Sequence, residues 1–338
     1  MNQRAEQKLG TSTGQVAYRP RRLGHVNLFV DNMEETCSFL HDICGFEQTG
    51  MLSKTRSAFY SNGNTHHDIG FIEAKAYLDF RKKYPDPADP PGRGSKPGLN
   101  HFGWEMEHES ALVNAYRRAI EQGLSPRITN NGTSLSNYLF DPDGGQHQFY
   151  ADEELDWRKV YTGGEVDLHR PASWVPGEKP PSTDRNYDPS PRLRRDGDAP
   201  VHPMRVTHGT LLTPNFPEMF AYYTDVAGLE PVFGGLKDGV VYLKGAASHY
   251  DIILLQGDAP SGVLHHASFE VWPDEDLNAA EERLAKAGVN VLHRGDFPHK
   301  KSLCIAGPSG MRFEFFVRGE SNFSAVQDAS PSQRPFVA

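Results

Sequence analysis

The chain has 338 residues, a formal net charge of −9 at pH 7 and a sequence pI near 5.9. This length allows two domains of ordinary size. The acidic balance disfavours nucleic acid or an anionic membrane as the main partner, because such surfaces are bound by clustered Lys and Arg. The three cysteines lack a disulfide or zinc-site spacing, and no apolar run reaches the roughly 20 residues of a membrane helix. We therefore expect a cytoplasmic protein that acts on a small molecule.

The first half of the chain predicts six strands and two helices, after a flexible arm over residues 1–19. Alternation of apolar and polar residues indicates a half-buried strand at 23–30. A helix is expected at 33–42, with Asn32 as its N-cap and Gly45 after its last turn. The Pro-, Lys- and Asp-rich segment 74–98 is interpreted as an insertion. The remaining elements are a hairpin over 57–72, a strand at His101, a helix at 110–123, and strands at 136–140 and 146–150.

The same order of elements begins again after Arg205. The second copy consists of a strand at 206–212, a helix at 217–226, a hairpin over 240–255, a strand opening at His266, a helix at 275–288 and a turn at 307–310. The turn lies where residues 141–144 lie in the first copy. The chain is therefore an internal duplication, with modules at 20–165 and 204–319. A Pro- and Arg-rich linker at 166–203 joins them, and a flexible tail is expected at 320–338.

Each copy has one candidate ligand on its first strand, one at the start of its fourth and one on its last. These are His208, His266 and Glu314 in the second copy, and His25, His101 and Gln148 in the first. Two imidazoles and a carboxylate from separate strands can occupy one face of an octahedral Fe(II) and leave the other face open. An amide lacks the charge that offsets the dication. We therefore expect the metal in the second module and a metal-free first module.

Three motifs carry a resemblance to a known family: Leu23-Gly24-His25-Val26, Leu264-His265-His266-Ala267-Ser268-Phe269 and Gly307-Pro308-Ser309-Gly310-x-x-x-Glu314. Both copies resemble βαβββ modules of the vicinal oxygen chelate superfamily. Their pairing resembles the type I extradiol (catechol 2,3-dioxygenase-like) ring-cleaving dioxygenases. The resemblance implies an α+β fold in which paired βαβββ units form a curved, mixed sheet around a cavity. It also implies Fe(II) in the C-terminal module, a small aromatic diol and O2 as substrates, a role in aromatic catabolism, and a homo-oligomer.

The residues expected around the metal depart from that family. Extradiol enzymes commonly place a tyrosine ten residues before the ligand glutamate, and Cys304 stands there in this chain. A histidine usual on the hairpin strand aligns with Tyr250. His293 and His299, both expected in a loop, are the candidates for the acid–base histidine. His265 is expected on the opposite sheet face from His266, because neighbouring strand residues alternate.

The first module keeps some of the chemistry that the second lacks. Tyr138 lies ten residues before Gln148, and His67 lies on the hairpin. This divergence leaves two further functions open. The protein could be a lyase, isomerase or hydrolase of the same superfamily that uses Mn(II) or another divalent metal as a Lewis acid. It could also be a non-catalytic protein that binds an aromatic compound, with an affinity that survives loss of Glu314.

Overall fold

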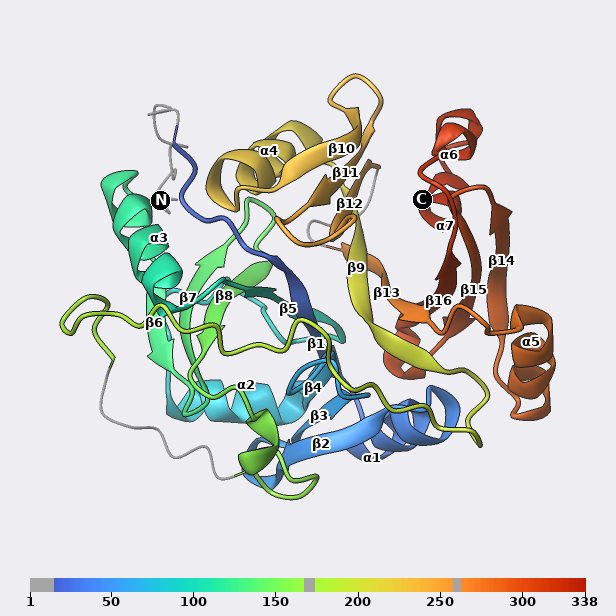
Figure 1. Ribbon diagram of the computed structural model, residues 1–338, viewed down its shortest axis with the longest axis horizontal. Helices are drawn as coiled ribbons and strands as arrows, with labels where there is room; N and C mark the ends of the chain where they lie inside the picture. The colour runs from blue at the N-terminus through green and yellow to red at the C-terminus, as the bar shows by residue number, and fades with distance from the viewer. Residues whose placement is uncertain (1–14, 167–173, 258–262) are drawn as a thin grey trace.

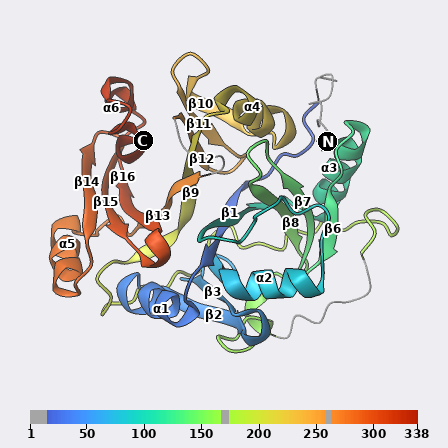
Figure 2. The same ribbon diagram turned by 180° about the vertical axis from the view of Figure 1, so that it is seen from behind.

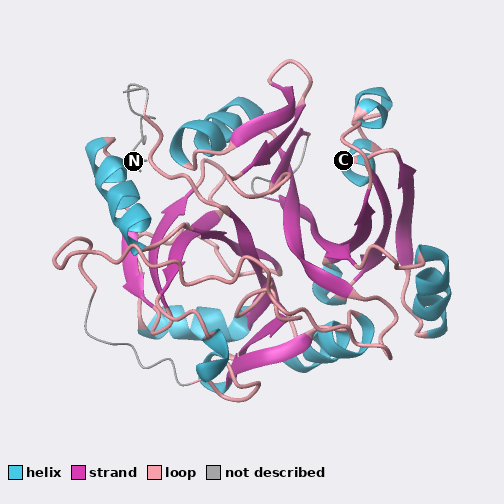
Figure 3. Ribbon diagram, in the orientation of Figure 1, coloured by secondary structure: helices cyan, strands magenta, loops and turns pink. Residues whose placement is uncertain are grey.

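The computed structural model describes residues 15–166, 174–257 and 263–338, and each half of the chain forms one eight-stranded mixed sheet (Figure 1). Figure 3 shows helices packed along both sheets. The expected α+β fold of two repeated modules, each built from paired βαβββ units, is confirmed. Within the described residues, no helix is both long and apolar enough to cross a bilayer.

The first sheet has the strand order β2-β3-β4-β1-β5-β8-β7-β6. Its strands are β1 (Arg22–Val30), β2 (Glu47–Leu52), β3 (Ser57–Ser61), β4 (Ile69–Glu73), β5 (Gly98–Glu105), β6 (Arg127–Asn130), β7 (Ser134–Phe140) and β8 (Gln146–Asp152). Its helices are α1 (Met33–Ser38), α2 (Ala74–Lys83) and α3 (Glu109–Glu121). Strand β1 pairs in parallel with β4 and antiparallel with β5, so it lies near the centre of the sheet.

The second sheet repeats this order as β10-β11-β12-β9-β13-β16-β15-β14. Its strands are β9 (Pro203–Thr213), β10 (Glu230–Gly235), β11 (Val240–Lys244), β12 (Ile252–Gln256), β13 (Val263–Val271), β14 (Val291–Phe297), β15 (Lys300–Ala306) and β16 (Arg312–Arg318). The helices are α4 (Phe216–Ala221), α5 (Leu277–Lys286), α6 (Ser324–Asp328) and α7 (Arg334–Val337). The sequence predicted six strands in each half; the four that it missed, β2, β6, β10 and β14, are the sheet edges.

The duplication extends to the helix ends. Helix α1 continues into a π-helical turn, Phe39–Ile43, and α4 continues into Tyr222–Val226. Both turns are followed by a glycine in the left-handed region, Gly45 with φ +67° and Gly228 with φ +73°. The predicted glycine stops are therefore confirmed, because only glycine adopts this conformation without a steric penalty.

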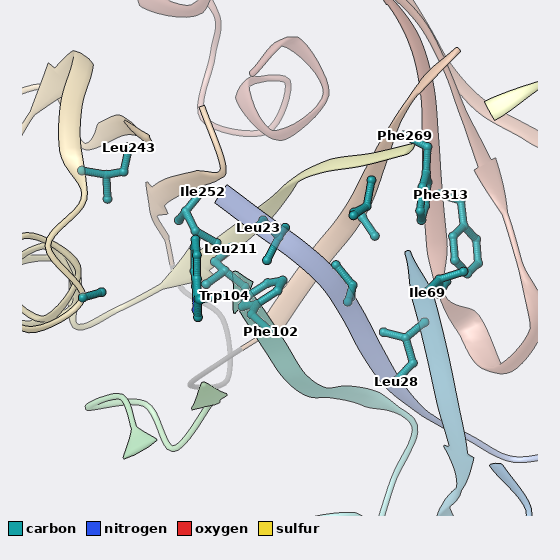
Figure 4. Close-up of a cluster of buried hydrophobic side chains, with 14 of the residues drawn as sticks. Leu23, Leu28, Ile69, Phe102, Trp104, Leu211, Leu243, Ile252, Phe269 and Phe313 are labelled. Atoms are coloured by element: carbon teal, nitrogen blue, oxygen red, sulfur yellow. The ribbon is translucent and has the colours of Figure 1, made fainter. Parts of the chain in front are cut away.

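One cluster of buried apolar side chains runs through both modules (Figure 4). Along β1, Val26 and Leu28 belong to this cluster, while His25 lies on the other face of the strand and contacts polar side chains. The modules approach closely at Gly209 of β9, where a Cβ atom would lie 2.6 Å from the Phe102 ring of β5. The shared core therefore fixes the two sheets against each other and leaves their inner faces for polar groups.

Segments outside the repeats cover these inner faces. Residues 74–98, expected as an insertion, begin with α2, which lies in front of the first sheet in Figure 2. The Tyr77 ring on α2 packs 4.8 Å from the Phe29 ring of β1. The expectation of a flexible tail at 320–338 is wrong, because α6 and α7 lie there and bury Val326 and Val337 against the second sheet.

The other two segments expected to lack regular structure lie partly outside the described residues. Residues 1–14 and 167–173 are not described. Tyr18, at the end of the expected arm, is buried, and its ring stacks 3.8 Å from that of Phe149. Residues 174–202 form no helix or strand, and Trp174 Nε1 donates a hydrogen bond to Glu109 Oε1 (3.3 Å).

Two buried aspartates join the modules at equivalent positions. Asp68, just before β4, accepts a hydrogen bond through Oδ1 from the backbone N–H of Val206 in β9 (2.9 Å). Asp251, just before β12, accepts one through Oδ1 from the backbone N–H of Leu23 in β1 (2.7 Å). Each module therefore holds the first strand of the other.

The Asp251 contact predicts a pH dependence of stability. Burial raises the pKa of Asp251 from 3.8 to about 6, although hydrogen bonds from Ser248, Leu23 and Gly245 lower it. Because the folded state holds the proton more tightly, the contribution of Asp251 to stability falls by roughly 2–3 kcal/mol as the pH rises from about 4 to about 6. Urea unfolding of wild type and Asp251→Asn across this window should show their difference in free energy of unfolding shrinking. A constant or widening difference contradicts the assignment.

Candidate metal centre

The structure brings together the three residues predicted in the second module. His208 of β9, His266 of β13 and Glu314 of β16 are buried on the inner face of the sheet, and their ligand atoms lie within 4.8 Å of one another. Glu314 Oε2 lies 3.7 Å from His208 Nε2 and 3.5 Å from His266 Nε2. Strand pairing explains this convergence, because Ser268 of β13 is opposite both His208 and Glu314.

Hydrogen bonds set the tautomer of His208. The Thr207 hydroxyl donates to the Ser268 carbonyl (3.2 Å), so it accepts from His208 Nδ1 (2.9 Å). His208 Nε2 therefore carries a lone pair, and it is buried without a hydrogen-bond partner among the described residues. Burial lowers the pKa of His208 well below its ordinary value, which keeps the imidazole neutral. A neutral, unpartnered nitrogen next to a carboxylate oxygen fits a divalent cation.

His266 belongs to a second hydrogen-bond chain. Arg312 Nη1 donates to His265 Nε2 (2.7 Å), so His265 donates through Nδ1 to His266 Nδ1 (2.8 Å). This leaves a proton on His266 Nε2, beside Thr210 Oγ1 (3.2 Å), and a bound metal would displace that proton. The prediction that His265 faces away is wrong, because a bulge between Leu264 and His266 breaks the alternation.

Lys300 of β15 is a site residue that the sequence did not predict. Its side chain is fully buried, and Nζ donates to Glu314 Oε1 (2.7 Å) and to the backbone oxygen of Ala338. Burial alone would raise the pKa of Glu314, but Lys300, with His266 and His208, holds it well below its ordinary value. One carboxylate oxygen is therefore bound to an ammonium group, and the other, which also accepts from Ser268 Oγ (2.9 Å), faces the imidazoles. The even spacing of Lys300 and Cys304 on one strand could have indicated their shared face.

Tyr250 and Cys304 lie next to the triad. The Tyr250 ring lies 4.7 Å from the His208 ring, edge to face, and it also lines a cavity of 690 Å³. Cys304 is opposite Glu314 in the pairing of β15 with β16. Burial, together with Glu314, raises the pKa of Cys304 to about 12, so its thiol stays protonated at neutral pH.

The two candidate acid–base histidines lie under the C-terminal segment. His293 belongs to β14 rather than to a loop, and its ring stacks 4.8 Å from that of Phe336. His299 lies between β14 and β15, is buried rather than solvated, and donates through Nε2 to the Val337 carbonyl (2.8 Å). Burial lowers the pKa of His299 to about 4, which keeps it neutral. No hydrogen bond within the described part of the chain joins either histidine to the triad.

The counterparts in the first module also converge, but as a hydrogen-bonded set. His25 Nε2 lies 3.2 Å from Gln148 Oε1 and 3.3 Å from His101 Nε2. The His67 ring packs against that of His25, with centroids 4.1 Å apart. Tyr138 Oη accepts from Asn131 Nδ2 (3.4 Å) and lines a separate cavity of 470 Å³ together with His101.

The buried Lys300–Glu314 pair predicts how substitutions affect stability. Glu314→Ala leaves the Lys300 ammonium buried without its partner, which should cost about 3–5 kcal/mol in the metal-free protein. Glu314→Ala combined with Lys300→Met removes both charges and should recover most of that loss. Chemical denaturation of the four members of this double-mutant cycle measures the coupling. Additive losses would contradict a tight ion pair.

Comparisons with known proteins agree with this geometry. Residues 22–149 and 205–315 match the model of the Glyoxalase/Bleomycin resistance protein/Dioxygenase superfamily. The chain is 24% identical over 279 residues to a catechol-2,3-dioxygenase of Bacillus subtilis (strain 168), covering 80% of this chain and 89% of that protein.

Solved structures show the same fold. The 2,3-dioxygenase LapB from Pseudomonas sp. KL28 is similar with a TM-score of 0.62 and 20% identity, over 90% of this chain and 94% of that one. The Mn(II)-bound glyoxalase from Novosphingobium aromaticivorans has a TM-score of 0.61 and 17% identity, over 89% of this chain and 83% of that one. Since the family model matches most of both modules, the chain belongs to the Glyoxalase/Bleomycin resistance protein/Dioxygenase superfamily.

Proposed function

We propose that the protein is an Fe(II)-dependent, extradiol-type dioxygenase that cleaves the ring of a catechol or related vicinal dihydroxyaromatic with O2. The module at 204–319 is its catalytic module, and His208, His266 and Glu314 are its metal ligands. The observation that carries this proposal is the unpartnered His208 Nε2, which lies with His266 Nε2 around one oxygen of Glu314. Similarity to a catechol-2,3-dioxygenase over 80% of the chain supports the reaction class.

The metal and the protein would contribute different chemistry. Bound Fe(II) would bring the diol and O2 together at its open positions and pass electrons between them. Tyr250 lines the 690 Å³ cavity and its ring also packs against that of His208, so it would pack against the aromatic ring of the substrate. His299 also lines this cavity and is the candidate to move a proton, with His293 as the second candidate. Both histidines contact residues 336–337, so that segment would shift when a substrate needs them.

One observation favours a second candidate function within the same family. Cys304 lies where extradiol enzymes carry a tyrosine hydroxyl, and its buried thiol is a weak donor. The same three ligands would then hold Mn(II) or another divalent metal as a Lewis acid, in a lyase, isomerase or hydrolase. A purely ligand-binding protein is the third candidate, and it would not depend on Glu314.

Oxygen consumption distinguishes these functions. Full-length protein loaded anaerobically with Fe(II) should consume O2 with at least one member of a catechol panel and form a yellow ring-opened product. The Glu314→Ala/Lys300→Met variant, which keeps the core free of an unpaired charge, should show neither. Stoichiometric Fe(II) without O2 uptake on any diol would exclude the dioxygenase, and activity with Mn(II) alone would favour the second candidate.

The position of Lys300 predicts a change in metal affinity. Lys300→Met removes a buried positive charge 2.7 Å from the ligand carboxylate, so the affinity for Fe(II) or Mn(II) should rise about tenfold or more. Competition with a coloured chelator under anaerobic conditions measures this change. Lys301→Met, an exposed neighbour on the same strand, is the matched control and should leave the affinity unchanged. Weaker binding by Lys300→Met would mean that Lys300 positions Glu314 for the metal.

A further inference from the structure

A second group of buried histidines lies in the first module, apart from the triad. One ligand atom from each of His25, His66 and His67 falls within 4.8 Å of the others, and all three side chains are buried. His25 comes from β1, and the other two from the turn between β3 and β4. Thr49 Oγ1 holds this turn by donating to the His66 carbonyl (2.6 Å), and Asp68, the next residue, is bound to β9. The turn is therefore anchored on both sides.

The hydrogen bonds around His25 place its lone pair on the ring nitrogen that does not face Gln148 and His101. These two residues correspond to Glu314 and His266 of the second module. Gln148 Nε2 donates to Ser136 Oγ (2.9 Å), so its Oε1 accepts from His25 Nε2. His101 Nδ1 donates to Asn100 Oδ1 (2.8 Å), which leaves His101 Nε2 as a second acceptor for the same proton. His25 Nε2 is therefore protonated, and Nδ1 carries the lone pair. Within the described residues, His25 Nδ1 has no hydrogen-bond partner.

The other two histidines are also in the form that binds metals. Neither ring nitrogen of His67 has a hydrogen-bond partner in the described part of the chain. His66 Nδ1 lies 3.3 Å from Thr65 Oγ1 and 3.7 Å from Asp152 Oδ1, which leaves Nε2 for a ligand. Burial lowers the pKa of all three histidines, that of His66 to about 4. A buried nitrogen without a hydrogen-bond partner destabilises the fold, and a cation bound to all three histidines would offset that loss.

We propose that His25, His66 and His67 bind a divalent transition metal of the zinc type at a site separate from His208, His266 and Glu314. Three imidazole nitrogens with an open fourth position suit Zn(II) and its neighbours rather than Mg(II) or Ca(II). Asp152 would act as the outer carboxylate that orients His66. Thr65 and Asp152, which lie beside His66 Nδ1, also line a cavity of 420 Å³ with Asp156, so a cation would approach the cluster from this side.

Metal stoichiometry tests this site on the full chain. Chelator-treated protein is incubated with Zn(II), desalted and analysed for bound metal. We expect about two equivalents in wild type, about one in Glu314→Ala/Lys300→Met and about one in His67→Gln. His41→Gln, which removes an exposed histidine of the same module, is the control and should keep both. One equivalent in wild type that is lost with Glu314 overturns this proposal and leaves the proposed function intact.

A spectroscopic measurement keeps the test independent of how well His67→Gln folds. Zinc X-ray absorption of the Glu314→Ala/Lys300→Met variant should show a shell of nitrogen ligands at about 2.0–2.1 Å with the outer scattering of three imidazoles. His67→Asn and His66→Gln should each reduce that imidazole count by one. Zinc bound through fewer than three imidazoles, or no zinc bound by this variant, contradicts the proposal.

Discussion

Two buried carboxylates hold the histidine-bearing strands of both modules in place. Asp68 accepts from the backbone of Val206, and Asp251 accepts from that of Leu23, so each bond crosses from one module to the other. Both bonds end two residues before a first-strand histidine. In both strands an irregularity in the pairing lies between this amide and the histidine, so the fixed amide sets the start of the irregular step after which His208 or His25 faces its site. The placement of each site therefore depends on a residue of the opposite module.

The two modules differ in the charge of the residue that faces the first-strand histidine. In the second module Glu314 can only accept hydrogen bonds, and it faces a lone pair on His208 Nε2, an arrangement that favours a cation between them. In the first module the Gln148 oxygen accepts a hydrogen bond from His25 Nε2, so no cation is needed there. With an amide in place of the carboxylate, the lone pair of His25 lies on Nδ1, whereas that of His208 lies on Nε2. The duplicated histidine keeps its strand position while the nitrogen that carries its lone pair changes.

The sequence alone predicts the parts of the fold that follow from a local pattern of residues. The central strands, the glycine stops and the convergence of His208, His266 and Glu314 follow from alternation and from comparing two copies. The four edge strands did not, because a strand paired on one side only can lack the alternation of buried and exposed residues; β10, for example, has consecutive exposed residues at Glu230, Pro231 and Val232. Their pairing is set by the neighbouring strand, which a local pattern does not encode.

Lys300 and the C-terminal segment escaped prediction because they depend on each other. Lys300 precedes the exposed Lys301, so the pair resembles an ordinary charged turn, and residues 320–338 are too polar to predict a packed segment. Packing supplies what the local pattern lacks: Val337 accepts a hydrogen bond from His299, Ala338 accepts one from Lys300, and Lys300 binds Glu314. In the first module α2 covers the inner face instead. Helix α2 and the C-terminal segment lie outside the duplicated elements. Each module could therefore change the access to its site and the polarity of that site without altering the strands that hold its histidines.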